Sequence, residues 1–232
     1  MPSLRTDTDS IETGAFFTST TLAGKNTTAT NSTVPYVSYS ASDGSIQFAV
    51  NIDTNTNDLY FSLSTLGDGS WTGVGIGSDQ MDDKALILIA YPTSNQQNVT
   101  VSPRRTTGHT EPSYTNNYTL ELLPGSCIED ENLYAYGRLN GCGDLWTGNT
   151  SFIFAYGPGP VSNGDSVTAD LRFHSTVGVF TMDLQQARGN GGVPSLNGRD
   201  IGSWEISLET KNELSAPFHG QLLLNPEQNP LY

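Results

Sequence analysis

An iron ion could take two ligands from this chain, the thioether of Met81 and the imidazole of His174, which lie 174 − 81 = 93 residues apart. A thioether and an imidazole that share one iron form a site that transfers electrons and leaves no coordination position free for a substrate. Met81 follows the glycine-rich run 73–77, so its side chain can turn inward from a loop, and His174 precedes an alternating segment that can fix its ring. A single methionine beside a strand is usually core filler, so the assignment depends on the surrounding elements.

Other chemical motifs fit the sequence less well. The run from Gly73 resembles a dinucleotide-binding loop, but its sixth position is Ser78 and the residues that follow are a poor start for a helix. Residues 53–64 imitate a calcium loop, yet the sixth is Asp58 instead of glycine and the twelfth is Ser64 instead of glutamate, so a hairpin turn is the better interpretation. No Gly-x-Ser-x-Gly motif occurs, and three histidines with two cysteines form no recognisable zinc set. The acidic residues are scattered over turns, which is typical of a solvated surface and not of a glycosidase pair.

The composition limits the partners. The 232 residues include 10 Lys and Arg against 24 Asp and Glu, which gives a formal net charge of −14. This balance argues against nucleic acid or an anionic membrane as a partner, and it favours cations or basic protein surfaces. The length suits one large all-β domain, which we expect to be a monomer.

The hydrophobic pattern predicts an all-β fold. Short β-type segments, separated by Gly, Pro, Asn and Asp, recur at 36–40, 45–52, 58–64, 72–76, 85–91, 98–102, 118–122, 133–136, 151–156, 177–184 and 203–208. This spacing indicates a two-sheet antiparallel β-sandwich or a barrel instead of a βαβ fold. Residues 85–91 are apolar on both faces and should lie in the centre of the core, whereas 180–184 alternate and should face solvent on one side.

Three regions are expected along the chain. Residues 1–33 are rich in Thr, Ser and Asn and are read as an N-terminal arm, and 34–208 form the sandwich. Residues 209–232 carry Pro217, Pro226 and Pro230 and are read as an extended strap or linker stub.

Several features favour a secreted, extracellular protein. Asn-x-Ser/Thr sequons, the expected glycosylation sites, occur at Asn26, Asn31, Asn98, Asn117 and Asn149. In an oxidising compartment Cys127 and Cys142 would close a short loop as a disulfide, and the alternative is two unrelated buried thiols. No run approaches the ~20 apolar residues of a membrane span, and we expect the chain to begin after any signal peptide.

An ordered set of segments carries a family resemblance. These segments are 71–81, the apolar strand 85–91, Val101 to His109 with Glu111-Pro112, Cys142 to Trp146, and 174–187. Together they resemble the cytochrome domain of fungal cellobiose dehydrogenases, a DOMON-type iron reductase domain, over about residues 35–208. The resemblance implies an immunoglobulin-like antiparallel sandwich with a haem pocket at one end. It also implies that one haem b relays electrons from a flavin dehydrogenase partner to a lytic polysaccharide monooxygenase, ferric iron or another acceptor.

The resemblance also implies roles for individual residues. Met81 and His174 fall on the family's axial iron ligands, and Met/His ligation raises the reduction potential above that of bis-His ligation. Because the chain has no Cys-x-x-Cys-His motif, the haem would be held without covalent attachment. His109 stands where the family usually has an aromatic residue near a haem propionate, and it could donate a hydrogen bond there or act as a rival iron ligand. Tyr91 is also assigned to the haem site.

Two further assignments depend on the family pattern. Arg104 or Arg105 would neutralise a propionate, the alternative being a solvated arginine at a strand end. The family commonly has two cysteines close together before the tryptophan, whereas here the partner of Cys142 would be Cys127.

Two other functions remain open. The first is a haem-free, carbohydrate-binding DOMON sandwich in which Trp71, Trp146 and Trp204 form a sugar platform. The second is the extracellular part of a membrane reductase, with a b561-like segment after residue 232. A stand-alone cytochrome and a domain cut from a flavocytochrome have the same sequence features. The domain alone is expected to oxidise no sugar, because it lacks a fingerprint for flavin binding and its iron would have no open position.

Overall fold

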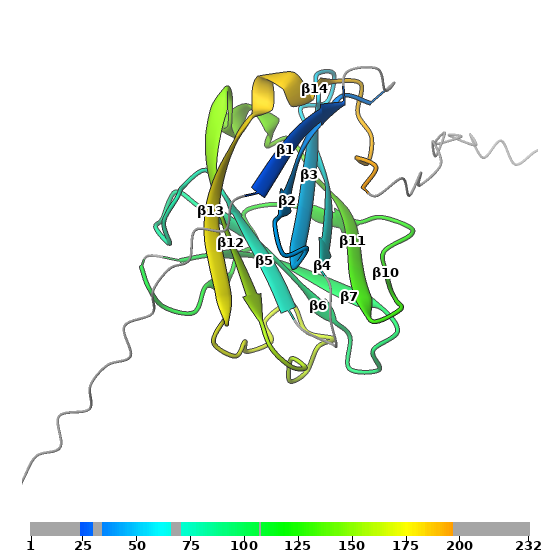
Figure 1. The fold of residues 1–232 in the computed structure, drawn as a ribbon, viewed down its shortest axis with the longest axis vertical. Coiled ribbons are helices and arrows are strands. Elements are labelled where there is room, and N and C mark those ends of the chain that lie inside the picture. Colours follow the sequence, from blue (N-terminus) through cyan, green and yellow to red (C-terminus); the bar gives the residue numbers. More distant parts are fainter. Residues whose placement is uncertain (1–23, 30–33, 66–70, 107, 197–232) are drawn as a thin grey trace, which may run out of the picture.

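The computed structural model describes residues 24–29, 34–65, 71–106 and 108–196. In this part of the chain every long element is a strand, and the helical elements are two short 3₁₀ turns at Gly143–Leu145 and Leu184–Ala187. The prediction of an all-β fold built from two antiparallel sheets is confirmed (Figure 1). The predicted strand 203–208, Trp204, Asn31 and the expected C-terminal strap 209–232 lie outside the described residues.

The larger sheet, sheet A, has the order β1-β2-β3-β4-β11-β10, with β14 beside β3 and β9 beside β11. Its strands are β1 (Gly24–Ala29), β2 (Tyr36–Ala41), β3 (Ile46–Asp53), β4 (Leu59–Thr65), β9 (Leu120–Leu122), β10 (Cys127–Glu129), β11 (Asn132–Leu139) and β14 (Arg188–Gly189). All pairs are antiparallel except β14 with β3. Strand β1 falls within the segment that the sequence assigned to an N-terminal arm, and it pairs along its whole length with β2.

The smaller sheet, sheet B, has the order β13-β12-β5-β6-β7-β8. Its strands are β5 (Trp71–Ile76), β6 (Leu86–Pro92), β7 (Val99–Arg105), β8 (Ser113–Tyr114), β12 (Asn149–Gly157) and β13 (Thr176–Asp183), all paired antiparallel. Strand β6 is buried at every position, and Phe180 and Met182 of β13 are buried while Thr181 is exposed. The sequence predicted both patterns.

The main core lies between the two sheets. Alternate residues of sheet B, such as Val74, Leu88 and Phe152, point into it, because successive side chains of a strand face opposite sides. Tyr39 of β2 stacks on Phe180 of β13 with ring centroids 3.9 Å apart, and Phe180 stacks on Phe152 at 4.8 Å. Stacked aromatic pairs contribute about 0.5–1.5 kcal/mol beyond the area they bury, so this column joins the sheets.

A second apolar cluster covers the outer face of sheet B. It includes Trp71 of β5, Ile87, Ile89 and Tyr91 of β6, and Ala169 of the connection between β12 and β13. This connection, residues 158–175, is the yellow segment at the lower end of Figure 1. Strand β6 is therefore apolar on both faces because it contributes to two cores.

The calcium-like segment forms a hairpin turn, as expected from its sequence. The Asp53 amide donates to the Asp58 carbonyl at 2.9 Å, and Asn57 adopts a left-handed backbone with φ of 61°. Antiparallel strands β3 and β4 flank the turn.

The expected disulfide between Cys127 and Cys142 is not formed, and both are free cysteines. Cys127 pairs with Tyr134 near the start of β11, whereas Cys142 follows the far end of that strand and donates its thiol to the Leu139 carbonyl at 3.6 Å. From Tyr134 to Leu139 the strand advances about 17 Å, while a disulfide needs Cα atoms less than ~7 Å apart. Strand β11 therefore keeps the two thiols apart. They are separate, as in the alternative of two unrelated buried thiols, but only Cys142 is buried and Cys127 is half-buried.

None of the helical turns in the described ranges has the length and hydropathy required to cross a membrane.

Candidate functional site

A cavity of about 410 Å³ lies against the outer face of sheet B, and not at one end of the sandwich, where a pocket was expected from the sequence. Its floor is formed by outward-facing residues of four strands: Gly73 and Gly75 of β5, Ile87 and Ile89 of β6, Ile153 and Ala155 of β12, and Val177 and Val179 of β13. Three loops supply its walls, with Asp79, Gln80 and Met81 from the first, His109 and Pro112 from the second, and Leu171 and His174 from the third. The cavity thus has an apolar floor and polar groups at its edges, which is the usual composition of a cofactor pocket.

Glycines make the floor flat. In β5, Val74 points into the main core, so Gly73 and Gly75 face the cavity. A Cβ atom on Gly75 would lie 2.5 Å from Ile153 Cγ1, and one on Gly73 would lie 3.3 Å from Ile89 Cγ1. The glycine-rich run that imitates a dinucleotide loop is therefore a strand whose missing side chains leave room over the sheet.

The loop that carries Met81 is shaped by its own hydrogen bonds. It leaves β5 through Gly77, whose φ of 101° suits glycine and whose position for a Cβ lies 2.5 Å from Trp146 Nε1. The Asp82 carboxylate accepts from Ser78 Oγ and from the Lys84 amide, both at 3.0 Å. These contacts hold the loop so that the half-buried Met81 lines the cavity.

His174 reaches the same cavity from the connection between β12 and β13. The Ser175 amide donates to the Tyr156 carbonyl at 2.9 Å, which fixes the backbone beside the histidine as β13 begins. The ring lies 4.3 Å from that of the exposed Phe173, centroid to centroid. Burial lowers the pKa of His174, because the charged imidazolium is disfavoured away from water. The neutral imidazole that results is the form that can bind a metal ion.

His109 also lines the cavity, from the loop between β7 and β8, and its side chain is exposed. It therefore lies at the rim of the cavity. This position is compatible with both roles expected for His109, a hydrogen bond to a propionate and competition for the metal.

Arg104 and Tyr91 do not line the cavity, in contrast to the assignment made from the sequence. Tyr91 is fully buried and donates its hydroxyl to the Ser166 carbonyl at 2.6 Å, and Arg104 is buried with its guanidinium directed at protein acceptors. Both side chains support the connection that carries His174. Arg105 lies elsewhere, donating to the Asp83 carbonyl at 3.1 Å and to Tyr118 Oη at 2.6 Å.

The tryptophans of the carbohydrate-binding alternative do not form an open platform. Trp71 and Trp146 are only 5% and 8% exposed, and Trp204 is outside the described residues. A second, more open and polar cavity of about 610 Å³ shares Asp79 and Gln80 with the first, but Trp146 contributes to it as a buried packing residue. A stacked sugar needs an exposed ring face, which neither described tryptophan provides.

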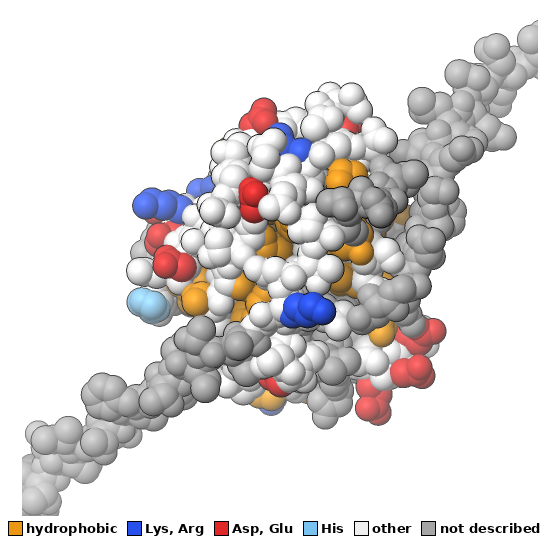
Figure 2. Space-filling model, turned by 45° about the horizontal axis from the view of Figure 1, so that its top comes forward, with side chains coloured by type: hydrophobic (Ala, Val, Ile, Leu, Met, Phe, Trp, Pro, Cys, Tyr) orange, Lys and Arg blue, Asp and Glu red, His pale blue; other side chains and the backbone are white. Residues whose placement is uncertain are grey.

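Four of the five sequon asparagines lie within the described residues, and all four are exposed. Asn26, Asn98, Asn117 and Asn149 are exposed, as a glycan attachment site requires. On the face drawn in Figure 2, lysines and arginines are scattered among acidic side chains and form no extended basic patch. Within the described ranges, no three His, Cys, Asp or Glu side chains gather as a metal site.

Comparison with known proteins gives two kinds of similarity. A family model described as the cytochrome domain of cellobiose dehydrogenase matches residues 25–191. Among solved structures, the cytochrome b domain of pyranose dehydrogenase from Coprinopsis cinerea superposes with a TM-score of 0.60 at 16% identity, covering 71% of this chain and 91% of that one. The cytochrome domain of Myriococcum thermophilum cellobiose dehydrogenase gives a TM-score of 0.59 at 15% identity, covering 72% and 91%. No curated protein matches the chain.

Proposed function

We propose that this chain, which belongs to the family of the cytochrome domain of cellobiose dehydrogenase, binds one haem b in the cavity on sheet B and transfers single electrons. Met81 and His174 would hold its iron. The observation that carries the proposal is that these two side chains, 174 − 81 = 93 residues apart, line one apolar cavity.

The residues present fit a haem. The glycines of β5 and the isoleucines of β6 and β12 offer a flat apolar surface, which suits the face and edge of a porphyrin. A thioether and a neutral imidazole are the donor pair found on electron-transfer haems. Polar groups at the edge, including His109, would meet the propionates, and burial with ligation would hold the group because no covalent attachment motif is present.

The bound haem supplies a one-electron couple, and the protein residues tune and protect it. Ile87, Ile89 and Ile153 exclude water from the floor. The soft sulfur of Met81 favours the ferrous state and so raises the reduction potential. Because Met81 and His174 would both hold the iron, no position would remain for a substrate, and we expect the domain by itself to oxidise no sugar.

The remaining parts of the proposal concern partners and location. The electron donor is a flavin dehydrogenase domain or protein, or a membrane reductase, and the acceptor is ferric iron or a lytic polysaccharide monooxygenase. The exposed sequons support secretion and glycosylation. The haem-binding sandwich would span 34–208 together with β1, and 209–232 would act as a linker.

Reoxidation of the reduced protein tests electron relay. The reduced chain should be reoxidised quickly by a ferric complex and slowly by dioxygen, since dioxygen needs an open iron position. A faster reaction with dioxygen than with the ferric complex would overturn the relay.

A further inference from the structure

The connection that carries His174 has a regular set of partners on sheet B. Residues 158–175 contain no strand or helix, yet side-chain donors from β5, β6 and β7 reach their backbone carbonyls in order. These bonds are Thr100 Oγ1 to Gly164 O at 2.6 Å, Tyr91 Oη to Ser166 O at 2.6 Å, Ser102 Oγ to Val167 O at 2.5 Å, Arg104 Nη2 to Ala169 O at 2.5 Å, and Trp71 Nε1 to Arg172 O at 3.1 Å. The sheet thus fixes the path of an irregular segment up to two residues before His174.

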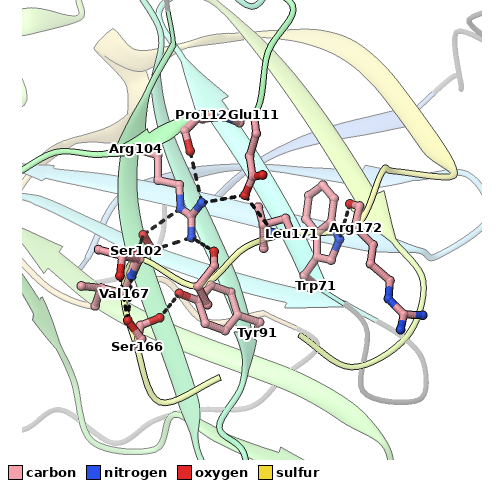
Figure 3. A network of polar contacts seen from close by, with 12 residues as sticks. Trp71, Tyr91, Ser102, Arg104, Glu111, Pro112, Ser166, Val167, Leu171 and Arg172 are labelled. Carbon is pink, nitrogen blue, oxygen red and sulfur yellow. Dashed lines mark hydrogen bonds and ion pairs between the residues drawn. The ribbon is translucent and has the colours of Figure 1, made fainter. Parts of the chain in front are cut away.

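Arg104 is the centre of this set (Figure 3). Its side chain is 3% exposed. Its Nε donates to Ser102 Oγ at 3.0 Å, and Nη1 donates to the Pro112 carbonyl at 3.1 Å and lies 3.4 Å from Glu111 Oε1. A guanidinium presents its donors in one rigid plane, so it can hold several acceptors in fixed relative positions.

Glu111 joins the two walls of the cavity. Its Oε1 faces Arg104 and also accepts the Leu171 amide at 2.8 Å. One wall carries His109 and Pro112, and the other carries Leu171 and His174. The Arg104–Glu111 pair therefore ties both walls to β7, as the dashed lines in Figure 3 show.

We propose that Arg104 and Glu111 are positioning residues that set the place of His174 over sheet B, and that Arg104 acts through this clamp and not by contact with a haem propionate. The inference rests on the proposed function for its effect on haem. Its effect on residues 164–174 does not depend on haem.

The clamp is tested with the full chain, both haem-free and after haem addition. Arg104→Met removes the guanidinium, and Arg104→Lys keeps the charge but cannot span the same acceptors. Glu111→Gln and Tyr91→Phe are milder changes. The first removes the charge that faces Arg104, and the second removes the hydroxyl that donates to the Ser166 carbonyl. Arg138→Met is the matched control, because Arg138 of β11 forms ion pairs with Asp58 and Glu121, and none of the three lines the cavity.

Two readouts separate positioning from general stability. In the haem-free chain, Arg104→Met should raise amide hydrogen exchange in 164–174 by about tenfold over the wild type. Glu111→Gln keeps an acceptor for the Leu171 amide but removes the charge that faces Arg104, so it should raise exchange in the same segment by less. In the haem-loaded chain, Arg104→Met and Arg104→Lys should release haem about tenfold faster and show a high-spin fraction, since His174 is less well placed. Arg138→Met should match the wild type in both.

The outcomes distinguish this inference from the proposed function. If Arg104→Met does not fold, the same measurements on Glu111→Gln and Tyr91→Phe decide whether the clamp positions residues 164–174. Wild-type exchange in 164–174 together with wild-type haem release in the variants would overturn the clamp. A wild-type chain that takes up no haem would refute the proposed function, while the exchange data would still decide the clamp.

Discussion

Met81 reaches the cavity from the loop between β5 and β6, and His174 reaches it from the connection between β12 and β13. Different contacts hold the two segments. The loop of Met81 is fixed by the bonds of Asp82, and His174 is fixed by the segment held on sheet B. Burial lowers the pKa of His174, so its imidazole stays neutral to a lower pH than in water. Contacts within the protein therefore hold both side chains at the cavity.

Exchanging the sulfur ligand should change the potential and preserve binding. Met81→His should keep a low-spin haem and lower the reduction potential by on the order of 100 mV, because imidazole replaces the softer thioether. Potentiometric titration measures this. Met182→Leu, in the main core, is the matched control and should leave the potential as it is. An unchanged potential in Met81→His would mean that Met81 is not a ligand.

Both cysteines should react as free thiols once the chain is unfolded. Burial raises the pKa of Cys142 to about 12, so its reactive thiolate is scarce at pH 8. Under denaturing conditions without reductant, a thiol reagent should label both cysteines, whereas in the native chain Cys142 should be labelled far more slowly than Cys127. Finding no reactive thiol in denaturant would show that the two are joined after all.

At the level of elements, the strands were easier to predict than the parts that close the site. The burial of runs such as 85–91 can be predicted from their composition, because a strand that is covered on both faces is apolar throughout. The family resemblance singled out Met81 and His174, and the structure brings both side chains to one cavity. The covering segment 158–175 was not visible, because it has no periodicity and its carbonyls are satisfied by side chains far away in sequence.

The surroundings of Arg104 and of the two cysteines could likewise not be predicted from the sequence. A strand-end arginine is usually solvated, and its actual acceptors, Pro112 and Ala169, come from segments that the sequence does not place near it. The separation of Cys127 from Cys142 depends on the length of β11, whose extent to Leu139 exceeded the predicted strand 133–136. The glycines at 73 and 75 did carry a usable signal, because their alternation with Val74 places both on one face.

The flat floor of sheet B should be necessary for haem binding. In Gly75→Ala the new Cβ would push Ile153 toward the cavity, and we expect haem release to quicken by roughly tenfold while the sandwich remains folded. Haem transfer to an apoglobin measures the rate, and thermal unfolding checks the fold. Gly108→Ala is the control, since a Cβ there meets nothing within 4 Å. Equal release rates in the two variants would contradict a haem on this floor.

For the whole molecule, charge should govern which acceptors react quickly. With a formal net charge of −14, the reduced protein repels anions at low ionic strength. Its reaction with ferricyanide should therefore quicken several-fold between about 10 and about 200 mM salt, and its reaction with a cationic ruthenium complex should slow. Stopped-flow measurements give both rates. The opposite salt dependence would reveal a basic patch near the haem edge.

The state of the iron tests the central claim most directly. We predict that the full chain, titrated with haem, binds one equivalent and gives the absorption and magnetic circular dichroism spectra of a six-coordinate, low-spin iron with one thioether and one imidazole ligand. No Soret band from bound haem, or a high-spin spectrum with an open coordination position, would contradict it.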